Sequence, residues 1–217
     1  MDILLKYRSF TIWYILIIIA NLIFLSWLTD YKMVSKPLIM ASLIGFYIGA
    51  ARQQSPVFIL ALIFAMLGDI FLMFKSEAFF LLGLGCFLIM QILYTITFLK
   101  DKSPAVRQNI YKALPVFIIS VMVIVSLWDG LHDMQLPVTI YTAAISSMVV
   151  SALIRKNVSW YLPVVVGVVL FMMSDAAIAF SKFGFPFPCA EYFIILTYMI
   201  AQFLIVRGVV ERDEKEI

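Results

Sequence analysis

LGDIFLM, residues 67–73, sets a single carboxyl group, that of Asp69, inside an apolar run from about residue 56 to residue 74. A charged aspartate in the middle of a membrane helix costs roughly 3 kcal/mol, so it persists where it faces the interior of a bundle and has a partner. The stretch therefore predicts a membrane helix with one acid on its inner face.

A second stretch repeats this arrangement far along the chain. Residues 172–178 read MMSDAAI and place Asp175 in another long apolar run. Gly68 and Ser174, which precede the two acids, are small enough to let neighbouring helices approach closely. We therefore expect Asp69 and Asp175 to form one shared site. The alternative is that each acid only forms a structural bond to a neighbouring helix.

A shared pair of acids has a chemical consequence. Two carboxyl groups in a medium of low dielectric constant do not readily ionise together, so one is expected to keep its proton. Such a pair supplies a general acid and, beside it, a base or a stabiliser of positive charge. Asp69 and Asp175 are therefore the predicted catalytic residues, and at this point their two roles are interchangeable.

The composition makes lipid the expected solvent. Of 217 residues, 64% are hydrophobic and 13% are charged, and the mean hydropathy is +1.05. A soluble core could not bury so much apolar surface. The net charge of +3 is too small to indicate nucleic acid, and two cysteines form neither a disulfide framework nor a metal-ligand pattern. We expect no metal, no cofactor and no protein partner. The expected partners are the membrane lipids around the chain.

Eight apolar runs predict an all-α, polytopic bundle that forms a single transmembrane domain over residues 1–217. Each run is close to the length that crosses about 30 Å of hydrocarbon. The predicted helices cover about 10–28, 36–51, 56–74, 78–99, 112–128, 136–154, 160–180 and 189–209.

The basic residues predict the orientation of this bundle. Most of the 16 Lys and Arg residues fall on the side that holds the N-terminus, so both termini are predicted to be cytoplasmic. Asp69 and Asp175 then lie at similar depth in the non-cytoplasmic half, in a mouth surrounded by Lys36, Lys75 and Lys182. We expect an integral multi-pass protein of a bacterial inner membrane.

Other polar side chains within or beside the runs are candidate substrate-binding groups. A lysine can bind a phosphate or simply extend to the membrane interface, and buried amides and hydroxyls can equally bond helix to helix. The candidates are Lys36, Asn21, Gln91, Tyr141, Tyr198 and Gln202.

Five pieces of the sequence resemble the YhhN family of membrane proteins, and together they span nearly the whole chain. They are residues 35–38 (SKPL), 67–69 (LGD), 83–94 (GLGCFLIMQILY), 170–175 (LFMMSD) and 198–205 (YMIAQFLI). Characterised members of that family are lysoplasmalogenases. The family pattern usually has a histidine where this chain has Gln91, and an amide cannot exchange a proton as a histidine does. This difference puts the full activity in question.

The resemblance implies hydrolysis of the vinyl ether bond of a lysoplasmalogen, an alkenyl-glycerophosphocholine or -ethanolamine, to a fatty aldehyde and the glycerophospho-head group. The carboxyl pair suits that chemistry, because one acid can protonate the alkenyl carbon while the second stabilises the resulting cation and activates water. The substrate would be a lysophospholipid that enters from the bilayer.

Two other classes of function stay open at this point. Intramembrane carboxyl groups also serve proton-coupled transporters, here of a small amphiphile. The third possibility is a structural or regulatory membrane protein with a degenerate site. It stays open because Gln91 stands where the family pattern usually has a histidine.

Overall fold

The computed structural model describes residues 2–27, 32–74, 76–100, 110–155 and 161–215. Within these ranges all regular structure is helical, without a strand, which confirms the predicted all-α class. The elements are α1 Asp2–Trp27, α2 Lys32–Ala50, α3 Pro56–Phe71, α4 Glu77–Leu99, η2 Ile110–Lys112, α6 Ala113–Leu131, η3 His132–Met134, α7 Gln135–Leu153, α8 Tyr161–Phe183 and α9 Ala190–Lys215.

The long helices overlap the eight apolar runs, and local chemistry explains several of their limits. Ser55 precedes α3 with Pro56 in its first turn, where the missing N–H of proline costs nothing. The Ser76 hydroxyl caps α4 by accepting a hydrogen bond from the backbone N–H of Phe79 at 3.3 Å. Some expected limits are wrong: α1 begins at Asp2 and not near residue 10, and α9 continues to Lys215 and not only to about residue 209. Helix α2 begins at Lys32, so Pro37 lies inside this helix instead of at its start.

Four stretches of the described chain are long and apolar enough to cross a membrane. They are Glu77–Leu99, Ala113–Leu153, Tyr161–Phe183 and Ala190–Glu211, and the second contains both α6 and α7. The apolar parts of α1, α2 and α3 are shorter, at Tyr7–Ile23, Pro37–Ala50 and Pro56–Phe71. Eight complete spans and cytoplasmic termini therefore stay predictions.

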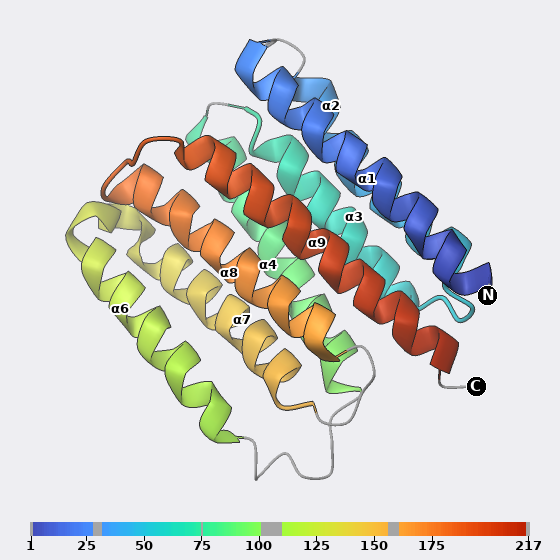
Figure 1. Ribbon diagram of the computed structural model, residues 1–217. Helices are drawn as coiled ribbons and strands as arrows, with labels where there is room; N and C mark the ends of the chain where they lie inside the picture. Colours follow the sequence, from blue (N-terminus) through green and yellow to red (C-terminus); the bar gives the residue numbers. More distant parts are fainter. Residues whose placement is uncertain (1, 28–31, 75, 101–109, 156–160, 216–217) are drawn as a thin grey trace.

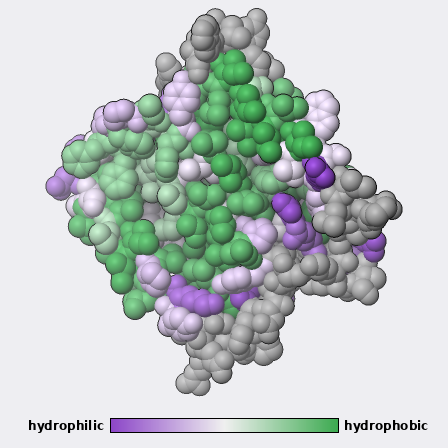
Figure 2. Space-filling model, viewed as in Figure 1, coloured by the Kyte–Doolittle hydropathy of each residue, from purple (hydrophilic) through white to green (hydrophobic). Residues whose placement is uncertain are grey.

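The outer surface fits a lipid environment. Trp13, Phe117 and Val125 are 67%, 65% and 67% exposed, respectively. Figure 2 shows apolar residues covering the middle of one face, with hydrophilic residues toward its rims. Large exposed apolar surfaces on a helical protein are expected where lipid is the solvent. The chain is thus an integral membrane protein by both composition and surface.

The helices lie alongside one another, with α1 and α2 on one edge of the bundle and α6 on the opposite edge (Figure 1). Two hairpins, α3–α4 and α8–α9, have the most extensive helix–helix contacts, and α4 also packs on α7. Because α3 and α8 end where α4 and α9 begin, one end of the bundle brings these four helix ends together.

Candidate active site

The two predicted acids face the same small cavity, which we call the acid cavity. It has a volume of about 60 Å³ and takes its walls from α2, α3, α4, α8 and α9. Asp69 lies near the end of α3, and Asp175 lies in the second half of α8. The remaining lining residues are Ile39, Leu72, Phe87, Ser174, Ile178, Ile194, Ile195 and Tyr198.

Asp69 accepts a hydrogen bond from a residue of the α8–α9 hairpin. The Tyr198 hydroxyl, on α9, donates a hydrogen bond to Oδ2 of Asp69 at 2.6 Å. Asp69 itself is only 9% exposed. A short bond of this kind to a buried carboxyl group orients the acid toward the cavity that both residues line.

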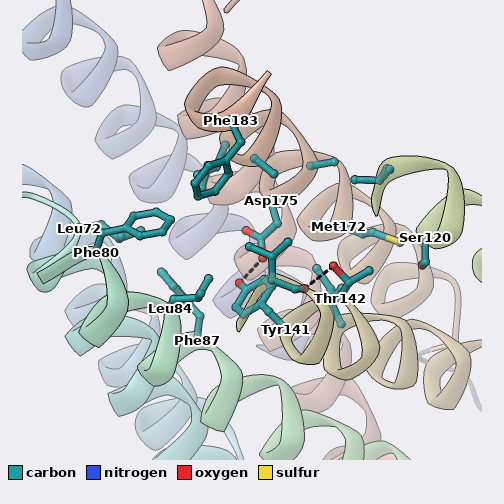
Figure 3. Close-up of a pocket in the computed structure, with 16 residues that line it drawn as sticks. Leu72, Phe80, Leu84, Phe87, Ser120, Tyr141, Thr142, Met172, Asp175 and Phe183 are labelled. Atoms are coloured by element: carbon teal, nitrogen blue, oxygen red, sulfur yellow. Dashed lines mark hydrogen bonds between the residues drawn. The ribbon is translucent and has the colours of Figure 1, made fainter. Parts of the chain in front are cut away.

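Asp175 is bonded by side chains from two other helices. The Tyr141 hydroxyl, on α7, donates a hydrogen bond to Oδ2 of Asp175, and these two side chains point toward each other in Figure 3. Nε2 of Gln91, on α4, lies 3.4 Å from the same oxygen, which is a long and weak bond. Oε1 of Gln91 is buried and has no hydrogen-bond partner among the described residues.

These bonds cross between the two hairpins. Gln91 belongs to the α3–α4 hairpin and contacts the acid of α8, whereas Tyr198 belongs to the α8–α9 hairpin and contacts the acid of α3. Each acid therefore accepts a bond from the hairpin that does not carry it, although the shorter bond to Asp175 comes from Tyr141 on α7. This arrangement ties the spacing of the two acids to the packing of the two hairpins.

The small residues before the acids serve close packing, as the sequence predicts. A Cβ atom at Gly68 would lie 2.8 Å from Cε2 of Phe87, so the absent side chain makes room for this ring of α4. Ser174 is fully buried, and its hydroxyl donates to the backbone carbonyl of Ile194 on α9 at 2.9 Å. Both acids thus follow a point of tight helix–helix contact.

Two further cavities adjoin the acid cavity. The side cavity, about 70 Å³, is mainly apolar and lies between α4, α6, α7 and α8, with Asp175 and Tyr141 in its wall (Figure 3). The mouth cavity, about 340 Å³, lies at the end of the bundle where α8 ends and α9 begins. Its walls are Leu25, Leu72, Phe80, Ile178, Ser181, Lys182, Glu191, Ile194 and Ile195.

The other predicted binding residues have different positions. Gln202 is fully buried, accepts a hydrogen bond from the Tyr94 hydroxyl at 2.7 Å, and lines none of the three cavities. Asn21 is buried on α1 and is also absent from their walls. The Lys36 side chain and the whole of Lys75 lie outside the described part of the structure.

Sequence reasoning missed several residues of the site. Leu72, Phe87 and Ile178 line the acid cavity, but nothing distinguishes them in sequence from the other apolar residues of their helices. Ser181 lines the mouth cavity, and its hydroxyl is buried without a hydrogen-bond partner in the described chain. Its position next to Lys182 was a usable signal.

The fold and the site together define a helical integral membrane protein with a pair of acids in a cavity near one end of its bundle. The sequence profile of the YhhN family matches residues 31–209, and the chain belongs to this family. No solved structure matches the chain.

Two curated relatives are similar over much of the chain. The protein named "Lysoplasmalogenase TMEM86A" from Bos taurus is 30% identical over 160 residues, which is 70% of this chain and 65% of that relative. The human protein of the same name is 27% identical over 183 residues, or 81% of this chain and 73% of the relative. The chain thus spans about two thirds of the length of the bovine relative.

Proposed function

We propose that this protein hydrolyses the vinyl ether bond of lysoplasmalogens, releasing a fatty aldehyde and a glycerophospho-head group. The observation that carries the proposal is that Asp69 and Asp175, on different hairpins, line one cavity. Relatives named lysoplasmalogenase, at 27% and 30% identity, support the choice of bond. Membership of the YhhN family supports the same choice.

The chemistry begins with a proton. In a vinyl ether, the alkenyl carbon on the hydrocarbon side takes the proton, and the carbon bonded to oxygen becomes an oxocarbenium ion. Asp175 is the proposed acid, because it lines both the acid cavity and the apolar side cavity where a hydrocarbon chain would lie. The Tyr141 hydroxyl holds the carboxyl group of this acid in place.

The second acid acts on the cation. Asp69 lines the acid cavity but not the side cavity, so it would lie beside the carbon bonded to oxygen, where its carboxylate stabilises the cation and takes a proton from the attacking water. The hemiacetal that forms then breaks its bond to the glycerol oxygen, which takes the proton held by Asp69 and leaves as an alcohol. The hemiacetal hydroxyl gives its proton to Asp175 as the aldehyde forms, so both acids return to their starting state. Paired carboxyl groups act similarly on the acetal carbon in glycosidases.

The direct test uses the purified full-length protein with an alkenyl-glycerophosphocholine. We expect release of a fatty aldehyde, measured by mass spectrometry, and no release from the saturated ether analogue. Absence of aldehyde from the alkenyl lipid would refute the proposal. Proton-gradient-dependent uptake of the intact lipid into proteoliposomes, without release of aldehyde, would instead support a proton-coupled transporter.

A further inference from the structure

The three cavities share walls that no single helix provides. Leu72 and Ile178 line all three, and Phe80 lines both the mouth cavity and the side cavity. Leu72 caps the C-terminal end of α3, and a Cβ atom at Gly83 would lie 2.8 Å from its Cδ2. The side chains of Leu72 and Ile178 therefore lie where all three cavities meet.

The mouth cavity has the chemistry of a phosphate site. The Lys182 amine lies 4.0 Å from the centre of the Phe80 ring and 5.7 Å from that of Phe183. The buried Ser181 hydroxyl, which lacks a partner among the described residues, lines the same cavity. An ammonium group and an unused hydroxyl donor suit the oxygens of a phosphate. The Glu191 carboxylate lines the same cavity and suits the positive end of a choline or ethanolamine head group.

The side cavity has the chemistry of a hydrocarbon site. Apolar side chains form most of its wall. In Figure 3, Leu72 and Phe80 lie toward one end, Met172 and Ser120 lie toward the other, and Asp175 is between them. A chain that enters past Leu72 would therefore pass Asp175 before it reaches the far end.

We propose that the three cavities form one track for a single-chain phospholipid, with the phosphate at Lys182 and Ser181, the reacting bond in the acid cavity, and the chain in the side cavity. In this proposal Leu72 and Ile178 form the partition between the three cavities, and rotation of these two side chains opens a path from one cavity to the next. This orientation rests on the proposed function, but occupation of the track does not require hydrolysis.

The first test maps the orientation with a saturated ether lysophosphocholine, which is not cleaved. One probe has a diazirine at the end of the chain, and a second has it on the head group. After irradiation of the full-length protein, the chain probe is expected at Val123, Thr142 or Ile145, and the head-group probe within residues 181–195. A reversed pattern, or chain labelling only on outward side chains such as Phe117 and Met122, would overturn the track.

Because the probes are not cleaved, the two proposals fail separately. Correct labelling without aldehyde release from the alkenyl lipid would overturn only the hydrolase. Aldehyde release with scattered labelling would overturn only the track.

The second test removes the phosphate contact. Lys182→Gln is expected to weaken binding of the ether lysophosphocholine about tenfold, the usual effect of losing one charged hydrogen bond. Binding of the matched alkylglycerol, which lacks phosphate, should not change. Lys100→Gln, an exposed lysine after α4, is the control and should change neither affinity. Equal weakening of both lipids, or of neither, would contradict the phosphate assignment.

The third test blocks the partition. Leu72→Trp should reduce labelling of Thr142 by the chain probe about tenfold or more, because a larger side chain fills the shared wall. Leu60→Trp is the matched control, since Leu60 lies on the same helix and is 44% exposed. Unchanged labelling in a folded Leu72→Trp protein would refute the partition.

Discussion

Asp69 and Asp175 have the same side chain and similar sequence surroundings, yet they have different neighbours. Asp175 lies in the walls of the acid cavity and the apolar side cavity, whereas Asp69 lines the acid cavity and not the side cavity. A substrate with a hydrocarbon chain therefore presents different atoms to the two acids. If the proposed mechanism holds, position relative to the side cavity, and not residue type, separates the proton donor from its partner.

The largest expected effect comes from removing each acid. Asp175→Asn should lower kcat for aldehyde release about 10³-fold, since it removes the proton donor. Asp69→Asn should lower kcat about 10²-fold, because it removes stabilisation of the cation. Steady-state kinetics at saturating lipid measure both, and KM should change little.

Asp133→Asn, at an exposed position in η3, is the control for these variants and should retain full activity. The assignment of roles fails if Asp69→Asn is the more damaging change. Full activity in both acid variants would eliminate the mechanism.

The tyrosines that hold the acids should show a smaller effect. Tyr141→Phe and Tyr198→Phe each remove one hydroxyl donor to a carboxyl group, so kcat should fall about tenfold. Tyr94→Phe removes a buried hydroxyl that bonds Gln202, away from the cavities. It should lower the free energy of unfolding by about 1 kcal/mol and leave kcat unchanged.

These three variants separate orientation of the acids from general stability. Thermal unfolding in detergent and aldehyde release are measured on the same preparations. A loss of kcat in Tyr94→Phe equal to that in the other two variants would mean that the hydroxyls act only through stability.

Packing at the first acid should affect the stability of the protein. Gly68→Ala places a Cβ atom 2.8 Å from Phe87, so it should lower the free energy of unfolding by about 1–3 kcal/mol despite the better helix propensity of alanine. Gly45→Ala meets no atom within 4 Å and should stabilise the protein by up to about 1 kcal/mol. Equal changes in thermal stability would show that Gly68 is not needed for the contact between α3 and α4.

The sequence was sufficient to locate the helices and the acid pair because both depend on local pattern. Apolar runs mark helices, and a lone carboxyl group inside a run, as at Asp69, marks an inward face. The small residues beside the acids, Gly68 and Ser174, indicated close helix contacts that the structure contains.

The rest of the site depends on how distant helices are rotated against each other. Tyr198 and Asp69 are 129 positions apart, and no local pattern specifies that they bond. Gln202 lies on α9 as Tyr198 does, but it bonds Tyr94 and not an acid. The cavities likewise lie between several helices whose side chains leave a gap. Whether an apolar residue such as Leu72 borders that gap depends on the packing of all these helices, so it has no signature in the sequence.

One measurement tests the central claim most directly: hydrolysis of an alkenyl-glycerophosphocholine by the purified protein in D₂O, with mass analysis of the aldehyde. Protonation of the alkenyl carbon by Asp175, whose exchangeable proton comes from the solvent, predicts one deuterium on the carbon next to the carbonyl group. Aldehyde without deuterium at that carbon, or no aldehyde at all, would contradict acid-catalysed hydrolysis at the Asp69–Asp175 pair.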